Sequence, residues 1–453
     1  MRRTRMARDG HSTAAGVVAP LWAVLAFTFV NSFASGITFN GIFFITKNVF
    51  GFSQVTNCLL GLVLGVTYIA GAMAAGPIMR RVHASGSGLS ERGVLTLLML
   101  AAVGINAIPI GAWMLAGDAP MRSAWAVWVY LAMYSALTGV LWPIVESYLS
   151  GGRAGGGLRR AMGIWNCTWS SALILALGCI GPLGDPAGLG LPGFVAGFGA
   201  LSALMLASLL HAGALLVLPA LPRHPGEHGH EAGGVGGRAV PESYARLLRV
   251  HRILLPVVYF VMYALGPLLP DLAEKALAWL GDRKQIEVFA PILTSVWLAA
   301  RVGGFVVMGL WQSWHGRWTT AIAGPSLLLG GFGFMVLSPI GADGMVLFWL
   351  TLAGLIQFGV GSAMVYCAAL YYVLEVGSAQ VEAGGSHEAL IGVGYTLGPM
   401  CTLGPSVLAQ MGVVTMATAN AQVLALVGVA TLGGLGLAMW QGRPTRGGRV
   451  ERG

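Results

Sequence analysis

One arginine stands in the middle of a long apolar segment, where a charged side chain needs a particular environment. Arg301 lies in the stretch WLAARVGGF, about halfway through the apolar run Val288–Leu310. At the centre of a bilayer a charge costs about 2.5–3.5 kcal/mol on insertion scales, so it should face a wet cavity or a polar partner. Two interpretations stay open. Arg301 binds an anionic or hydroxyl-rich group of a ligand, or it is a structural arginine that is held by helix carbonyls or snorkels to the inner edge.

Polar and aromatic side chains recur in other apolar runs. Tyr259 and Tyr263 are spaced i and i+4, so they lie on one face of a helix. Such groups, with no deep carboxylate among them, suit a cavity that binds a small neutral polar ligand by hydrogen bonds and ring stacking. For any single residue, ordinary hydrogen bonding between helices is the alternative. The candidate ligand-binding residues are Asn31, Asn40, Asn166, Trp169, Tyr259, Tyr263, Arg301, Gln357, Tyr366 and Tyr395.

Two glutamates end long apolar runs beside basic loops. Glu146 precedes one such loop and Glu375 ends a later run. They could couple transport to protons, or they could form ion pairs that lock the inner side shut. We favour the lock, because both glutamates lie next to arginines. The predicted lock residues are Glu146 with Arg80, Arg81, Arg159 or Arg160, and Glu375 with Arg317.

Two other titratable positions have simpler explanations. His211 lies inside an apolar run, where a buried neutral histidine is expected more than a proton relay. The pair His387-Glu388 is expected at the start of a helix, where an acidic side chain stabilises the N-terminus.

The sequence predicts no metal site and no cofactor. His224, His228 and His230 could bind a metal, but they lie in a glycine-rich polar stretch that is expected to be unstructured. The 5 cysteines all lie in apolar segments and form no CxxC motif, which argues against a disulfide framework. No Walker A motif and no catalytic triad pattern stand out, so neither an ATP-driven pump nor catalytic residues are expected.

The composition is that of a membrane protein. Hydrophobic residues make up 56% of the chain and charged residues 9%, against about 25% charged residues in soluble domains. Such a surface must face lipid. The 68 glycines suit helices that pack closely inside a membrane. The net charge of +9 is carried by short loops, so membrane topology explains it better than a nucleic-acid partner.

Spanning a bilayer takes about 20 apolar residues in a helix. Twelve stretches qualify or nearly qualify, and the first is expected to be an uncleaved helix after a basic start. The predicted spans are Val17–Phe44, Cys58–Met79, Val94–Leu115, Trp125–Leu149, Met162–Leu183, Phe194–Leu218, Ile253–Leu272, Val288–Leu310, Thr320–Leu337, Val346–Leu374, Leu390–Met411 and Val423–Met439.

A polar, glycine-rich break divides the spans into two groups of six. The predicted domains are an N-terminal tail (1–16), a first six-helix bundle (17–218), a linker (219–252), a second six-helix bundle (253–440) and a C-terminal tail (441–453). With both tails and the linker in the cytoplasm, 20 of the 26 Lys and Arg residues lie on the cytoplasmic side and 5 on the outer side. This distribution follows the positive-inside rule and supports an even number of spans.

The two groups also resemble each other. A shift of 229 residues places Glu146 on Glu375, Gly163 on Gly392 and the run 154–156 on the run 383–385. The matches fall at equivalent positions, so a duplicated six-helix unit is favoured.

At this point the sequence resembles the major facilitator superfamily over nearly its whole length. The segment AGPIMRRV, with Gly76, Arg80 and Arg81, is similar to the basic loop between the second and third helices of that family. HGRW, with Gly316 and Arg317, is its counterpart in the second half. The acidic residue usual in the first-half motif is absent, and the subfamily is not assigned.

The resemblance implies an all-α membrane protein of two pseudo-symmetric six-helix bundles, with a central cavity around which the halves rock. It also implies secondary-active or facilitative transport of a small polar solute by alternating access. We expect a monomer in an inner or plasma membrane, with a coupling ion as a further candidate partner. A transport-dead receptor or a membrane-embedded enzyme on the same helices is the alternative.

Overall fold

The computed structural model describes residues 17–117, 120–153, 155–185, 197–226, 241–376 and 381–443 of the 453-residue chain. Over these residues the protein is helical and contains no strand. The prediction of an all-α fold is therefore confirmed. The physical reason is that a helix satisfies its backbone hydrogen bonds within one segment, as the interior of a bilayer requires.

The helices fall into two consecutive groups. The first group comprises α1 (Leu21–Phe39), α2 (Ile42–Phe50), α3 (Gln54–Ala84), α4 (Glu91–Ala116), α5 (Ala124–Ser150), α6 (Gly155–Gly184) and α8 (Ser202–Val217). The second comprises α9 (Glu242–Leu265), α10 (Leu269–Ala276), α11 (Arg283–Leu310), α12 (Thr319–Gly341), α13 (Gly344–Val376), α14 (Val381–Gln410) and α15 (Met416–Gln441).

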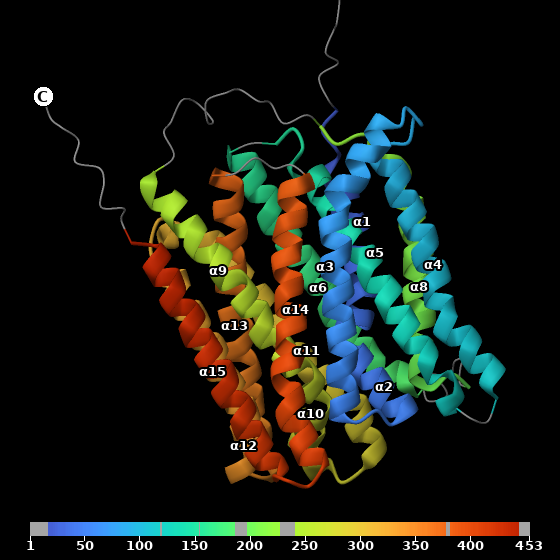
Figure 1. Cartoon of the computed structure of the whole chain (residues 1–453), viewed down its shortest axis with the longest axis vertical. Helices are drawn as coiled ribbons and strands as arrows, with labels where there is room; N and C mark the ends of the chain where they lie inside the picture. Colours follow the sequence, from blue (N-terminus) through green and yellow to red (C-terminus); the bar gives the residue numbers. More distant parts are fainter. Residues whose placement is uncertain are drawn as a thin grey trace, which may run out of the picture.

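The two groups form two halves that lie side by side (Figure 1). They meet along two helix pairs, α3 with α14 and α6 with α11. Glycine makes both contacts close. A Cβ atom at Gly65 would lie 2.5 Å from the backbone nitrogen of Thr396, and one at Gly181 would lie 2.0 Å from the carbonyl oxygen of Val288. Small residues at such seams let helix backbones approach each other inside a membrane.

Eleven helical segments of the described chain are long and apolar enough to cross a membrane by length and composition. The 30-residue α14 completes the bundle, packed between α3 and α9. This helix lies at the contact between the halves. It carries two prolines and two buried ionisable residues, His387 and Glu388. The architecture is that of a multi-pass membrane protein.

Large apolar side chains cover the outside of the bundle. Leu115, Leu216 and Leu310 are 91%, 84% and 81% exposed. A soluble protein rarely leaves extensive apolar surface in water, so this exterior fits lipid.

Several helix boundaries differ from the prediction. The first predicted span is broken at Asn40 and Gly41 into α1 and α2. Helix α9 begins at Glu242 rather than near 253, because its amphipathic first turns bury Leu247 and Leu248 against Trp314. Helix α14 begins at Val381 rather than near 390. Periodicity over the apolar core of a span does not reveal such polar extensions.

The described chain begins and ends at the same end of the bundle (Figure 1). The Arg153 guanidinium donates to the carbonyl oxygen of Ala19, next to the C-terminal end of α5. At the other terminus, Gly442 packs against Trp318 at the start of α12. Both ends therefore lie on the side where α3 ends and α4 begins, as an even number of spans requires.

Candidate functional site

A cavity lies between the two halves. Its volume is about 90 Å³, enough for several water molecules or a small solute. Side chains from α1, α3, α5 and α6 of the first half and from α9, α11, α13 and α14 of the second half line it. Most of these side chains are buried in the protein, so the cavity lies deep between the halves.

Arg301 on α11 points into this cavity and is only 1% exposed. Its guanidinium carbon lies 4.6 Å from the ring centroid of Trp169, 5.1 Å from that of Tyr366 and 5.4 Å from that of Phe305. The rings of Tyr259 and Trp297 are each 6.0 Å away. Such cation–π contacts stabilise a charge in an apolar setting, most strongly where water is absent.

The hydrogen bonding of Arg301 is incomplete. Its Nη2 donates to the Tyr259 hydroxyl at 3.4 Å, whereas Nε has no partner among the described residues. No ion pair between described residues includes Arg301. A guanidinium has five N–H donors, so this side chain has donors to offer to a ligand.

Aromatic rings form the opposite wall. The Tyr395 ring centroid lies 3.9 Å from that of Tyr263, 5.0 Å from that of Tyr68 and 5.5 Å from that of Tyr259. The Phe39 ring of α1 also contacts Tyr395, at 5.9 Å. The rings come from α1, α3, α9 and α14, so the wall exists only when the two halves are together.

A carboxyl cluster lies at the edge of the cavity. Glu388 of α14 lines the cavity and accepts a hydrogen bond from the Tyr68 hydroxyl. Across the contact between the halves, an oxygen of its carboxyl group lies within 4.8 Å of an oxygen of the Glu146 carboxyl group on α5. Two ionised carboxylates so close together repel each other, so this arrangement favours a proton on one of them.

His387 belongs to the same cluster. One ligand atom each of Glu146, His387 and Glu388 lie within 4.8 Å of one another. The His387 side chain is 6% exposed, and its Nε2 has no partner among the described residues. Carboxylate oxygens and an imidazole nitrogen at this spacing are also ligand atoms that suit a divalent cation.

A polar network supports the first half behind the cavity. Ser35 lines the cavity and lies 3.3 Å from the Tyr134 hydroxyl, which lies 3.2 Å from Nε2 of His211. Nδ1 of His211 lies 2.7 Å from the carbonyl oxygen of Ala207 and donates to it, so Nε2 accepts from Tyr134. His211 is fully buried in this network, in the place expected for a neutral histidine.

Seven of the ten candidate ligand-binding residues line the cavity, namely Asn40, Trp169, Tyr259, Tyr263, Arg301, Tyr366 and Tyr395. The other three do not. Asn31 is buried and donates to the Phe27 carbonyl of its own helix. Asn166 accepts from the Trp169 indole nitrogen at 3.1 Å, so it positions a lining side chain. Gln357 packs on Gly330 of α12.

The structure places the carboxyl group of Glu146 beside Glu388 and His387 of α14. Of the candidate lock residues, Arg81, Arg159, Arg160 and Arg317 are exposed near helix ends, and Arg80 lines a separate groove beside Arg252. The lock stays a prediction. The side chain of Glu375 is outside the described residues.

His387 and Glu388 do not cap a helix, contrary to the prediction. Helix α14 begins at Val381, so both residues lie more than one turn inside it. This position on α14 places Glu388 at the cavity and both side chains near Glu146.

Two further features had little signal in the sequence. Tyr68 and Trp297 line the cavity, and a single aromatic residue in an apolar run is too common to stand out. At the end of the bundle opposite the described termini, the Lys47 ammonium lies 2.5 Å from Asp271 and 2.9 Å from Glu274, which joins α2 to α10. Opposite charges in two segments between spans were the only available signal.

A second ion pair, Lys284 with Asp185 at 2.8 Å, also joins the halves at this end of the bundle. Charges as well as helix packing therefore connect the halves there.

No protein-family model and no curated protein matches the sequence. Solved structures do match its fold. The nucleoside transporter NupG is 13% identical with a TM-score of 0.61, and the alignment covers 94% of this chain and 99% of that one. A proton dependent oligopeptide transporter is also 13% identical, with a TM-score of 0.59 over 93% of this chain and 96% of that one.

A third match is a bacterial homologue of the human lysosomal transporter Spinster, in an inward-facing and unoccupied conformation. It is 15% identical, with a TM-score of 0.55, and the alignment covers 93% of this chain and 95% of that one. Similarity over nearly the whole length of each chain establishes the fold, and the match at such low identity concerns the fold alone.

Proposed function

Because the chain has the fold of the major facilitator superfamily, we propose that it carries a small polar solute across a membrane by alternating access. The observation that supports this most directly is Arg301, a buried arginine without an acidic partner among the described residues, which faces a cavity between the two halves. Transporters of nucleosides and of oligopeptides share this architecture. The chain is proposed to be a transporter and not an enzyme.

The preferred solute carries an anionic group, such as a carboxylate. A buried charge is costly unless it is paired, so Arg301 favours a ligand that brings the missing negative charge. The planar guanidinium can bind a carboxylate through two parallel hydrogen bonds. The rings of Trp169, Tyr366 and Tyr395 would pack on the body of the solute. The cavity volume of about 90 Å³ limits that body to a small molecule.

The proton shared by Glu146 and Glu388 is the proposed coupling ion. These residues belong to different halves and their carboxyl oxygens lie within 4.8 Å of each other, so a shared proton would hold the halves together on the inner side of the cavity. Loss of the proton would leave two buried negative charges side by side and push the halves apart. Proton release and opening toward the cytoplasm would then be one event.

On the outer side, the ion pairs of Lys47 and of Lys284 would have to break before the cavity opens outward. All of the side chains in these pairs are partly exposed. Such pairs contribute about 0–1 kcal/mol each, so they bias the closed state without trapping it.

The proposed setting is an inner or plasma membrane, with a monomer whose two termini and linker face the cytoplasm. The end of the bundle that holds both described termini also holds the arginine-rich ends of α3 and α9. Cytoplasmic loops carry an excess of arginine and lysine, which gives this orientation.

Uptake into liposomes reconstituted with the purified protein tests the proposal. A panel of small carboxylates, and an uncharged analogue of each, is first screened for an increase in thermal stability, and the stabilising compounds are then tested for uptake. We expect the carboxylates to be taken up and the uncharged analogues to be poorer substrates. Arg301→Ala should abolish uptake, whereas Arg122→Ala, at an exposed outer position, should not.

Two results would contradict the proposal. Normal uptake by Arg301→Ala would show that Arg301 is not needed to bind the solute. A solute that binds tightly to the central cavity but is never transported would indicate a receptor on the same scaffold.

A further inference from the structure

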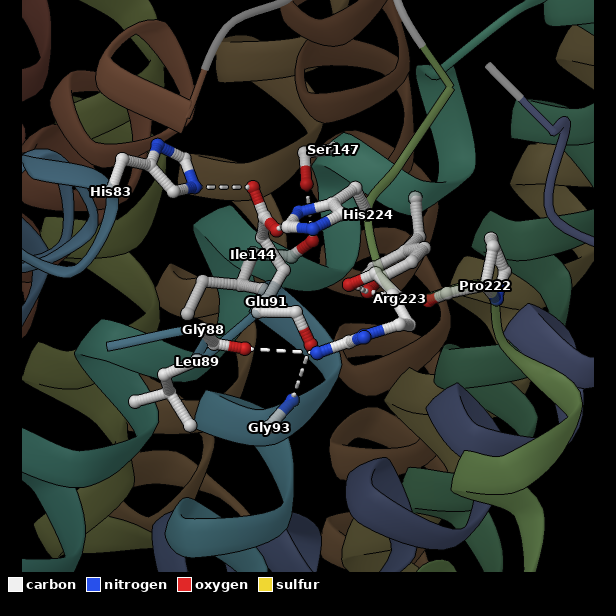
Figure 2. Close-up of polar contacts among 12 residues, drawn as sticks. His83, Gly88, Leu89, Glu91, Gly93, Ile144, Ser147, Pro222, Arg223 and His224 are labelled. Carbon is white, nitrogen blue, oxygen red and sulfur yellow. Dashed lines mark hydrogen bonds and ion pairs between the residues drawn. The ribbon is translucent and has the colours of Figure 1, made fainter. Parts of the chain in front are cut away.

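A second cluster of metal-ligating side chains lies at the cytoplasmic end of the first half, away from the central cavity. The Glu91 carboxylate receives one imidazole on each of its oxygens: Nε2 of His83 lies 3.0 Å from Oε1, and Nδ1 of His224 lies 2.6 Å from Oε2. One ligand atom from each of the three residues lies within 4.8 Å of the others. Figure 2 shows the two rings approaching the same carboxylate from different segments.

We propose that His83, Glu91 and His224 bind a transition-metal dication, with Zn²⁺ as the best fit. Two imidazole nitrogens and one carboxylate oxygen are ligands that Zn²⁺ takes at about 2.0–2.2 Å. Mg²⁺ and Ca²⁺ prefer oxygen ligands, so two histidines in three positions argue for a softer metal. A water molecule would complete a tetrahedral site.

The fold holds the carboxylate in place. Glu91 is the first residue of α4, after the cap Ser90, whose hydroxyl accepts from the backbone N–H of Gly93 at 3.3 Å. The Glu91 side chain is 7% exposed, which is unusual for an ionised group. His83 stands in the last turn of α3, so the short connection between α3 and α4 brings the two side chains together.

The start of the linker delivers the second histidine. Arg92 Nη1 donates to the carbonyl oxygen of Leu221 at 2.9 Å, and Arg223 Nη2 donates to that of Gly88 at 2.9 Å. The Tyr148 hydroxyl of α5 lies 3.0 Å and 3.1 Å from the carbonyl oxygens of Pro222 and Arg223. These contacts hold the segment immediately before His224 in place, independently of its imidazole.

The histidines themselves remain adjustable. Their side chains are 51% and 59% exposed, and their ring centroids lie 6.2 Å apart. Small rotations of exposed side chains can therefore bring the three ligand atoms to the shorter spacing that a metal needs. The carboxylate is fixed and partly desolvated, whereas the imidazoles can close onto the ion.

A metal bound here would fasten the linker to the first half. The linker joins the two halves, so the site ties the chain at the point where it leaves α8 and crosses toward α9. Because a metal that binds only the folded protein stabilises it, the clamp should raise resistance to unfolding.

The test uses the full-length protein without a histidine tag, purified in detergent and stripped of metal with a chelator. Titration calorimetry with Zn²⁺ should show one site per chain, and Co²⁺ should give the intense visible absorption of a tetrahedral complex. His83→Ala, His224→Ala and Glu91→Gln should each weaken Zn²⁺ binding by at least the about 10–100-fold that loss of outer-shell partners costs. Zn²⁺ should raise the unfolding temperature of the wild type and not of these variants.

The controls separate this site from the other candidates. His228→Ala/His230→Ala removes the other two linker histidines, and Glu146→Gln alters the buried carboxyl cluster; both variants should bind Zn²⁺ like the wild type. Binding that survives in His83→Ala and His224→Ala, or that disappears in either control, would overturn the proposal. His83→Gln, which keeps a hydrogen-bonding side chain, should unfold at the wild-type temperature in the absence of metal and still fail to bind.

Discussion

Arg301→Met separates a ligand-binding arginine from a structural one. Methionine keeps most of the length and apolar stem of the side chain but removes the charge and all five N–H donors. If Arg301 serves to bind a solute, the solute-free protein should tolerate the change. In that case burial of the unpaired arginine destabilises the solute-free protein, and only the bound solute offsets this destabilisation. If it is structural, the empty protein should lose stability.

The magnitudes follow from the surroundings of the guanidinium. Five rings lie within 6.0 Å of its carbon atom. At about 0.5–1 kcal/mol each, they stabilise the charge by about 2.5–5 kcal/mol. Burial of an ion costs several kcal/mol, and the 3.4 Å hydrogen bond to Tyr259 returns little. The stabilisation by the rings and the cost of burying the charge nearly cancel. We therefore expect the free energy of unfolding of solute-free Arg301→Met to be equal to or above that of the solute-free wild type.

The affinity for an anionic solute should change much more. A hydrogen bond to a charged group contributes about 1.5–3 kcal/mol, so its loss should weaken binding by about 10–150-fold. Quenching of intrinsic tryptophan fluorescence measures this affinity. The tryptophans that line the cavity are Trp142, Trp165, Trp169 and Trp297.

Two measurements together decide the matter. Thermal unfolding without solute reports the structural contribution of Arg301, and fluorescence titration reports its contribution to binding. A fall of several degrees in the unfolding temperature together with unchanged affinity would refute the argument and assign the arginine to the scaffold. The uncharged analogue is the control ligand, and its affinity should be nearly the same for both proteins.

Three further changes test other parts of the structure. Glu146→Gln keeps a hydrogen-bonding side chain but holds no exchangeable acidic proton, so uptake should no longer respond to a proton gradient; a preserved response would place coupling elsewhere. Lys47→Glu sets a negative charge against two acidic side chains of α10 and should open the outer side, measured as faster thiol labelling of the buried Cys58; unchanged labelling would show that the ion pairs do not hold the closure. Gly181→Val places a side chain 2.0 Å from a carbonyl oxygen of α11 and should lower the unfolding temperature, whereas Gly178→Val meets nothing within 4 Å and should not; equal effects would argue against the close helix contact.

The cavity and the carboxyl cluster together suggest why the two halves must move as units. The rings around Tyr395 come from both halves, and so do the neighbouring carboxyl groups of Glu146 and Glu388. Both the ring cluster and the pair of carboxyl groups are therefore lost when the halves separate. A solute that fills the cavity would contact both halves and stabilise the closed state by its differential affinity for it.

Much of the architecture follows from the sequence. Helical spans, their division into two groups and the exceptional position of Arg301 can all be predicted, because hydrophobicity along about 20 residues is a local property. A lone charge in such a run is equally visible. The family resemblance adds the central cavity between the halves, and the fold confirms that arrangement.

The direction in which each polar side chain points is decided by packing. Asn31 and Gln357 were as plausible as Asn40 from their sequence positions, yet only Asn40 lines the cavity. The rotation of each helix about its axis depends on contacts with its neighbours, such as the close approach at Gly65. No periodicity within one helix contains that information.

Pairings between distant segments are also set by the tertiary structure alone. Glu146 was expected to meet an arginine of a nearby loop, and the structure places Glu388 of the extended N-terminal part of α14 beside it. In the same way, the linker histidine His224 meets Glu91 only because backbone hydrogen bonds dock the linker on the start of α4. Hydrophobic runs determine which segments cross the membrane, whereas chemistry between segments depends on where the helix ends meet in space.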